Sequence, residues 1–244
     1  MREIIRITQK FAETDPLAWL HAQRVEAAAF YLCTDDYEVA AIGAASIAHE
    51  LPELADLPHD CHWYGGQRID ALCNNTSAEW EGFGKAFWMI PFLELRKTPN
   101  CTTIAAHLVH DGNSWISSAR EFLKLDFNDL TSPRVPPTTL PPIVSRDSNY
   151  YNDQDGPEHY ENAISAALEA IEEKKLEKVV LARLQRMQFA ASLSSLDVVR
   201  RWKYGGHEGG HLFYLKPSHY RSEFFGCTPE RLFRVLSNGC VRTE

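Results

Sequence analysis

Two short stretches of the chain carry residue types that could do acid–base chemistry, and the first is built around Lys178. Residues 177–183 read Glu-Lys-Val-Val-Leu-Ala-Arg, an apolar run between charged ends that predicts a buried strand. In such a strand Lys178 shares a face with Val180 and Ala182. Desolvation disfavours an ammonium among apolar side chains, so a neutral amine that accepts a proton becomes accessible. The pattern also fits a lysine whose stem packs while its ammonium reaches water.

The second stretch, residues 224–232, reads Phe-Phe-Gly-Cys-Thr-Pro-Glu-Arg-Leu. Two aromatic residues followed by glycine and proline predict a strand that ends in a tight turn, and the turn presents Glu230. A carboxyl beside such apolar neighbours tends to stay protonated, so it can donate a proton. Glu230 could equally pair with Arg231 or be solvated at the turn. A base and an acid on opposite sides of one substrate would support coupled proton transfers.

These two stretches together resemble the chorismate-utilising enzymes and, within that family, the isochorismate synthases. The resemblance rests on Lys-Val-Val-Leu-Ala-Arg at residues 178–183 and Gly-x-Thr-Pro-Glu-Arg-Leu at residues 226–232. In the related anthranilate synthases the position of Lys178 is usually glutamine, and a lysine accompanies water rather than ammonia as the nucleophile. Looser similarity to the menaquinone-type isochorismate synthases covers the first half, in the segments Pro-Leu-x-Trp-Leu from Pro16, Trp-Tyr-Gly-Gly-Gln-Arg-x-Asp from Trp63 and Phe-Trp-x-Ile-Pro from Phe87.

The resemblance implies a reversible conversion of chorismate into isochorismate. Lys178 would be the general base that activates water for attack at C2, and Glu230 the general acid that protonates the hydroxyl leaving C4. Mg²⁺ would hold the ring carboxylate, with ligands expected in a C-terminal half that this chain lacks. Arg183 is more simply explained as a structural pairing partner, and no substrate-binding residue is assigned.

Three other functions remain open. A salicylate synthase would share Lys178 and would also eliminate pyruvate. An amine-forming relative is disfavoured by the lysine at that position. The chain could also be a non-catalytic piece that binds a partner, such as the missing half of its own fold. The pathway served, menaquinone or siderophore biosynthesis, is equally open.

Periodicity and turn signals predict an α+β fold with a large, mainly antiparallel sheet and flanking helices. Asp15 and Pro16 provide a cap and a first-turn proline for a short helix. Further helices are expected from Pro157 onward and over residues 194–202. Strands are expected over residues 4–8, 28–33, 38–45, 61–68, 86–95, 102–109, 211–216, 222–225, 231–236 and 240–242.

Composition divides the chain at a proline-rich stretch, since residues 132–142 hold five prolines. We therefore expect an N-terminal subdomain over residues 1–130, a linker or surface crossing over 131–157, and the first part of a catalytic region over 158–244. The last strand stops at Glu244 within a motif that continues in the family. We expect a truncated chain that is inactive alone and that associates with its missing half or with itself.

The overall charge argues against a nucleic-acid partner, because 33 acidic residues exceed 25 basic ones and give a net charge of −8. No apolar run approaches the length of a membrane span, and the N-terminus lacks the apolar centre of a signal peptide. Six cysteines without CxxC pairing suit free thiols in a reducing compartment. The sequence therefore predicts a cytoplasmic protein.

Overall fold

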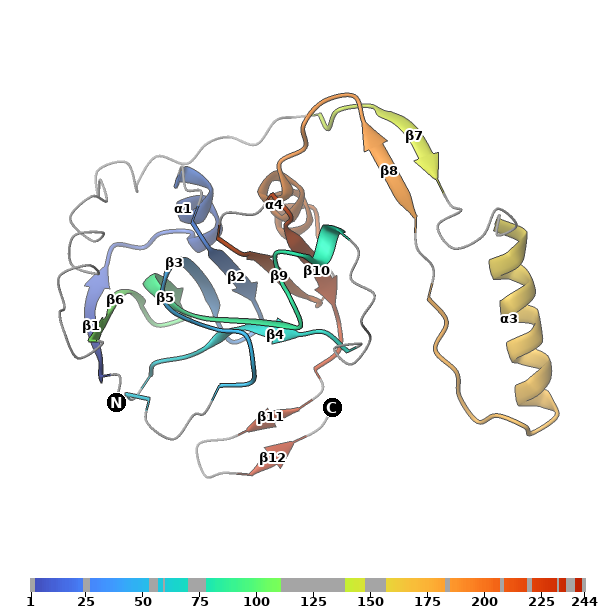
Figure 1. The fold of residues 1–244 in the computed structure, drawn as a ribbon, viewed down its shortest axis with the longest axis horizontal. Helices are drawn as coiled ribbons and strands as arrows, with labels where there is room; N and C mark the ends of the chain where they lie inside the picture. The colour runs from blue at the N-terminus through green and yellow to red at the C-terminus, as the bar shows by residue number, and fades with distance from the viewer. Residues whose placement is uncertain are drawn as a thin grey trace. The chain divides into compact units, whose positions relative to one another are not determined.

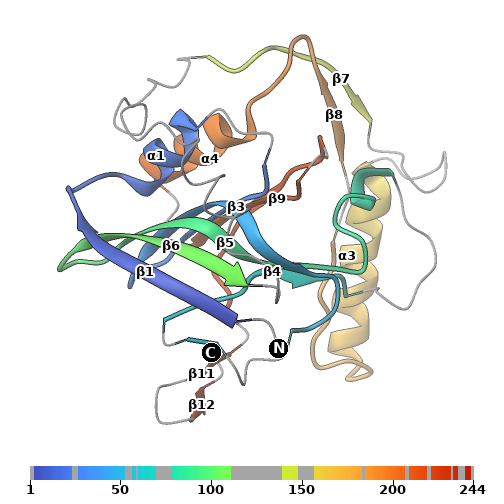
Figure 2. The same cartoon turned by 60° about the vertical axis from the view of Figure 1, so that its left-hand side comes forward.

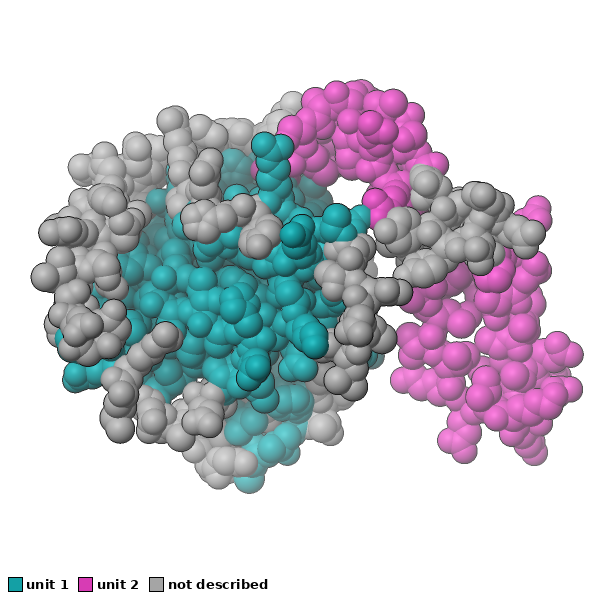
Figure 3. Space-filling model, viewed as in Figure 1, with its two compact units in different colours: residues 1–136, 195–244 teal, residues 137–194 magenta. Residues whose placement is uncertain are grey.

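The computed structural model describes residues 3–23, 27–52, 57–58, 60–69, 78–110, 139–147, 157–182, 185–206, 209–218, 221–231, 233–235 and 240–242. The chain divides into two compact units (Figure 3). We call residues 1–136 with 195–244 the sheet unit, and residues 137–194 the inserted unit. The predicted domains rest on composition and stay a prediction, and most of the predicted linker, residues 131–138 and 148–156, lies outside the described residues.

An eight-stranded antiparallel sheet forms the sheet unit's framework (Figures 1 and 2). The strand order is β1-β6-β5-β3-β2-β9-β10, and β4 pairs with the first part of β5, ahead of the part that pairs with β6. The predicted α+β fold with a large antiparallel sheet is confirmed. The strands are β1 (Glu3–Phe11), β2 (Ala29–Cys33), β3 (Glu38–Ala48), β4 (Tyr64–Gln67), β5 (Ala86–Lys97), β6 (Thr102–His110), β9 (His211–Lys216) and β10 (Phe224–Thr228).

The sequences of the central strands explain why these strands form. β5 is an almost continuous apolar run that is buried at most positions, which is typical of a strand covered on both faces. The predicted hairpin is confirmed as β2 and β3, with Thr34 Oγ1 accepting the N–H groups of Asp36 and Tyr37 in the turn. A β-bulge between Ala44 and Ser46 lies further along β3.

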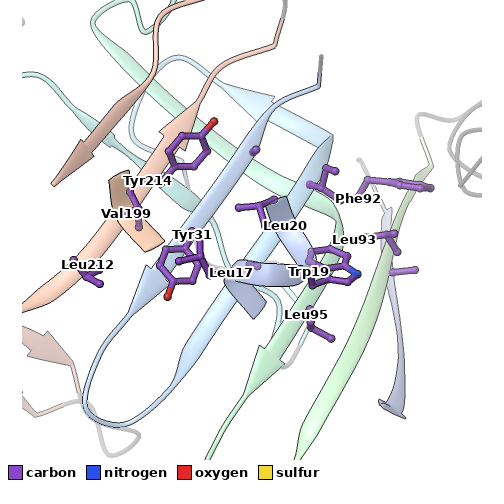
Figure 4. Close-up of a cluster of buried hydrophobic side chains, with 14 residues drawn as sticks. Leu17, Trp19, Leu20, Tyr31, Phe92, Leu93, Leu95, Val199, Leu212 and Tyr214 are labelled. Atoms are coloured by element: carbon purple, nitrogen blue, oxygen red, sulfur yellow. The ribbon is translucent and has the colours of Figure 1, made fainter. Parts of the chain in front are cut away.

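Helices α1 (Pro16–Ala22) and α4 (Ser195–Gly205) lie side by side on one face of the sheet. The predicted cap of α1 is confirmed, because Asp15 Oδ1 accepts the N–H of Ala18 at 2.8 Å. Buried side chains from both helices meet alternate residues of the strands (Figure 4). This cluster includes Leu17, Trp19, Leu20, Tyr31, Leu93, Leu95, Val199, Leu212 and Tyr214. It joins parts of the sheet unit that are far apart in sequence.

A polar network, the Lys203 clamp, ties α4 to α1 and β3. It consists of Asp15, Glu38 and Lys203. Lys203 Nζ donates to Asp15 Oδ2 at 2.8 Å and also to Glu38 Oε1. Tyr31 donates its hydroxyl proton to the same Glu38 oxygen at 2.7 Å. Because the Lys203 and Glu38 side chains are each only 13% exposed, the loss of Lys203 would leave the Glu38 carboxylate without its counter-charge in a largely buried place.

The described residues of the inserted unit form a helix and a pair of antiparallel strands, one strand before the helix and one after it. Helix α3 (Pro157–Glu172) begins where the sequence predicts it. Strands β7 (Ile143–Asp147) and β8 (Arg186–Phe189) pair antiparallel. In the sheet unit, the short strands β11 (Arg234–Val235) and β12 (Val241–Arg242) also pair antiparallel, as predicted.

Candidate functional site

Lys178 lies in the inserted unit, in an extended stretch after α3. Residues 177–182 form neither helix nor strand, and the side chains of Lys178, Val179 and Val180 are exposed. The predicted buried strand is therefore wrong for these residues, and Arg183 lies outside the described residues. A strand needs a neighbour for its backbone N–H and C=O groups, and no segment that the structure describes pairs with residues 177–182.

Glu230 follows strand β10 in the sheet unit, so the predicted strand and turn before it are confirmed, with the strand over Phe224–Thr228 rather than residues 222–225. The strand ends at Thr228, Pro229 bends the chain away, and the Glu230 side chain is exposed. The backbone N–H of Glu230 donates to Thr228 Oγ1 at 3.2 Å. This hydroxyl bond closes a small turn at the end of the strand and fixes the backbone that carries the carboxyl.

Gly226 is the position in β10 where a close approach requires glycine. It pairs with Phe213 of β9, and a Cβ at residue 226 would come within 2.6 Å of the Phe213 ring. The Phe213 ring also packs against the ring of Phe224, with centroids 5.2 Å apart. The glycine of the Gly-x-Thr-Pro-Glu motif is thus explained by an aromatic ring that crosses the strand.

Lys178 and Glu230 belong to different units, so the site that the sequence predicts is described in two separate parts. Their pairing as base and acid stays a prediction. Both side chains are exposed and can be reached by a substrate from solvent. The predicted burial of Lys178 among apolar side chains is therefore not found in the described residues.

An apolar cavity of about 650 Å³ lies within the sheet unit, and no local sequence pattern predicted it. Phe30 and Leu215 line it, and since side chains alternate along a strand, it opens on the face opposite α1 and α4. Its charged lining residues are Arg68 and Lys85. Such a lining can bury an apolar ring and hold an anionic substituent. The other lining residues are Leu32, Gly65, Gly66, Gln67, Ile69, Trp80, Phe83, Ala86, Phe87, Phe213 and Phe224.

A buried polar cluster around Glu94 forms a second feature that sequence reasoning missed. Glu94 is 1% exposed, and its carboxylate accepts bonds from Tyr64 at 2.8 Å and from Arg6 at 3.3 Å. Arg96 in turn donates to the Tyr64 hydroxyl at 3.3 Å. Burial, with the Glu94 charge nearby, raises the pKa of Tyr64 well above its usual value. The sequence signal for this cluster was the carboxylate of Glu94 inside the apolar run of β5, because a buried carboxylate needs polar partners.

His107 borders this cluster, and because it is buried we predict that the stability of the protein depends on pH. It is fully buried on β6 opposite Arg6, with Glu94 and His62 also close enough to influence it. Burial lowers the pKa of His107 from 6.5 to about 4. The unfolded chain therefore binds the proton more readily between these pH values. Stability is fully present above the unfolded pKa and is lost as the pH falls through this window, by up to about 3 kcal/mol.

The test is urea unfolding of the wild type and of His107→Leu at several pH values from 7 to 4. The variant keeps an apolar side chain of similar size but has no group to protonate at residue 107. We expect the difference between the two free energies of unfolding to change across this window. A difference that stays constant with pH would show that His107 does not cause the acid destabilisation.

Two other kinds of feature are absent from the described ranges. No three His, Cys, Asp or Glu side chains in these ranges come together in a way that could hold a metal ion. In the same part of the chain, no helix is both long and apolar enough to cross a membrane.

Most of the chain is similar to proteins of known family or structure. The family model described as "Chorismate binding enzyme" matches residues 52–243. Isochorismate synthase 2, chloroplastic, of Arabidopsis thaliana is 31% identical over 176 residues, which are 70% of this chain and 30% of the plant protein. The solved structure of MenF, the menaquinone-specific isochorismate synthase from Escherichia coli, has a TM-score of 0.70 and 22% identity. That match covers 96% of this chain and 51% of the bacterial chain, so this chain spans about half of that relative.

Proposed function

Because this chain belongs to the chorismate-binding enzyme family, as its two motifs predicted, we propose that it contributes the acid–base pair of an isochorismate synthase. Lys178 is the proposed general base and Glu230 the proposed general acid. The observation that carries the proposal is the presence of both motifs within the matched residues 52–243. The 31% identity with a plant isochorismate synthase further supports this reaction over others in the family.

The proposed reaction exchanges a hydroxyl group between two carbons of the chorismate ring. The Lys178 amine takes a proton from water while the water oxygen bonds to C2. The ring double bonds shift, the C4–O bond breaks, and Glu230 protonates the departing hydroxyl. One water is consumed and one is released, so the reaction is an isomerisation and is reversible. The return reaction uses the same two groups with their roles exchanged.

The proposed base must lose a proton, and this is easier when burial removes its ammonium from water. Lys178 is exposed here, next to Val179 and Val180, which are 41% and 80% exposed. We infer that this apolar stretch is covered when the complete active site forms. The covering surface would desolvate the amine and also bury two valine side chains.

The proposed cofactor and substrate follow from the family, and the proposed location follows from the composition of the sequence. Mg²⁺ is the proposed cofactor, supplying charge that holds a substrate carboxylate, but the described residues offer no site for it and no step is assigned to it. Chorismate is the proposed substrate, in a cytoplasmic setting without nucleic acid. This chain spans 51% of its bacterial relative, and we also propose that it associates with the remaining half of the fold or with itself.

The experiment incubates the purified chain with chorismate and Mg²⁺, alone and with a separate polypeptide that carries the remaining half of an isochorismate synthase fold. Products are separated by chromatography. We expect isochorismate only in the mixture. Salicylate with pyruvate would reassign the chain to the salicylate synthases, and an ammonia-dependent amine product would reassign it to that branch. Rapid turnover by the chain alone would contradict the need for a second polypeptide, and no product in either arrangement would overturn the proposed function.

A further inference from the structure

The turn at the end of strand β10 indicates how the proposed acid is held in place. We propose that Thr228 is a positioning residue that fixes the direction of Glu230, and this rests on the proposed function. Thr228 touches neither substrate nor reacting atoms in this proposal. It acts through the backbone of the residue two positions later.

The first support is the turn itself. Thr228 Oγ1 accepts the N–H of Glu230 at 3.2 Å, across Pro229. Proline has no backbone N–H and holds its φ near about −65°, so the connecting residue has little freedom of its own. The hydrogen bond to the Thr228 hydroxyl restrains the backbone of Glu230. Together they determine the direction in which the Glu230 side chain leaves the strand.

The second support is the anchoring of β10 to the core. Thr228 pairs with His211, and Cys227 pairs with Leu212, which is fully buried between the sheet and the helices. Gly226 lies under the Phe213 ring, where any larger residue would clash. A shift of β10 along β9 would break this fit, so the register is specified. The hydroxyl of Thr228 therefore links Glu230 to a fixed point of the sheet unit.

Positioning matters for an exposed acid because surrounding side chains do not enclose it. A misplacement of roughly 1 Å can reduce a rate by about a hundredfold, even when the catalytic group is unchanged. Loss of the Thr228 hydroxyl leaves the carboxyl present but less well directed. We therefore expect a fall in kcat of roughly tenfold to a hundredfold, without a matching change in KM.

The same type of hydroxyl bond occurs in a turn with no proposed role, and this supplies the control. Thr98 Oγ1 accepts the N–H of Cys101 at 3.2 Å, in the turn between β5 and β6. Thr98→Val removes this bond together with the one that the Thr98 hydroxyl donates to the Cys101 carbonyl at 3.1 Å, so it disturbs its own turn at least as much. If Thr228 served only to stabilise a turn, Thr98→Val and Thr228→Val would have similar effects.

The experiment compares wild type, Thr228→Val, Thr228→Ser and Thr98→Val, each in the arrangement that supports turnover. Valine keeps the shape of threonine but removes the acceptor, whereas serine keeps the acceptor. We expect Thr228→Val to lose kcat with unchanged KM, Thr228→Ser to recover most of it, and Thr98→Val to match wild type. Wild-type kcat in Thr228→Val, or an equal loss in Thr98→Val, would overturn the proposal.

A second measurement separates this inference from the proposed function. The backbone order parameter of Glu230, from ¹⁵N relaxation, needs no turnover. It should fall from about 0.85 toward about 0.6 in Thr228→Val and stay high in Thr228→Ser. If the wild type makes no product, the proposed function fails while this measurement still decides whether Thr228 orders Glu230. Equal order parameters in all variants would overturn the positioning role.

Discussion

Replacing Lys178 by alanine is expected to abolish isochorismate formation while leaving the sheet unit intact. The proposed base is the group that takes a proton from water, and the loss of a general base slows a reaction by at least roughly a hundredfold. Lys178 is exposed and lies in the inserted unit, so its removal takes no buried contact from the sheet. The measurements are kcat/KM with chorismate, in the arrangement that supports turnover, and urea unfolding of the same preparation.

Lys175 supplies the control for this variant. It is another exposed lysine after α3, and its ammonium lies 2.6 Å from the Glu173 carboxylate. Lys175→Ala loses a surface ion pair of little energetic weight and should keep wild-type turnover. If Lys178→Ala also turns over at the wild-type rate, Lys178 is not the base. If both variants lose activity equally, the effect is one of local charge rather than of proton transfer.

Replacing Glu230 by glutamine should give the second large loss, of at least roughly a hundredfold in kcat. Glutamine has the size of glutamate but cannot deliver the proton that the leaving hydroxyl needs. The bond from the residue 230 N–H to Thr228 remains, because it involves the backbone. Chorismate should therefore still bind, with KM close to that of the wild type.

Glu223, which precedes β10, offers a matched control for the acid. Its carboxylate lies 3.7 Å from the ammonium of Lys216, and its side chain is 24% exposed. Glu223→Gln should weaken that ion pair and leave turnover unchanged. Full activity in Glu230→Gln would leave Glu230 as an ordinary turn residue, and the positioning role of Thr228 would then have no catalytic purpose.

Local signals made much of this architecture predictable. The β2–β3 hairpin, the Asp15 cap and the strand and turn before Glu230 each depend on residues close together in sequence. The run after Lys178 has equally clear strand character, yet residues 177–182 form no strand. Strand propensity is realised only when a neighbouring strand is available, and that information is not local.

The cavity and the buried cluster around Glu94 could not be predicted from the sequence, because they also depend on residues that are brought together only by folding. The cavity brings together residues such as Phe30, Trp80 and Phe224, which are far apart in sequence. Arg6 reaches Glu94 because β1 pairs with β6 and β6 pairs with β5. The sequence shows that a carboxylate inside β5 needs partners, but only the strand order identifies Arg6 and Tyr64 as those partners.

The place of β9 beside β2 has a consequence for how the chain is made. Cys33 pairs with Leu212, whereas β1, β2, β3, β5 and β6 all end by His110. At translation rates of about 5–20 residues per second, the ribosome needs roughly 10–40 seconds to pass from one pairing partner to the other. During that interval the early strands can assemble while β2 offers an open, apolar edge to any other nascent chain. We expect the yield of folded protein to depend on chaperones that cover this edge until β9 emerges.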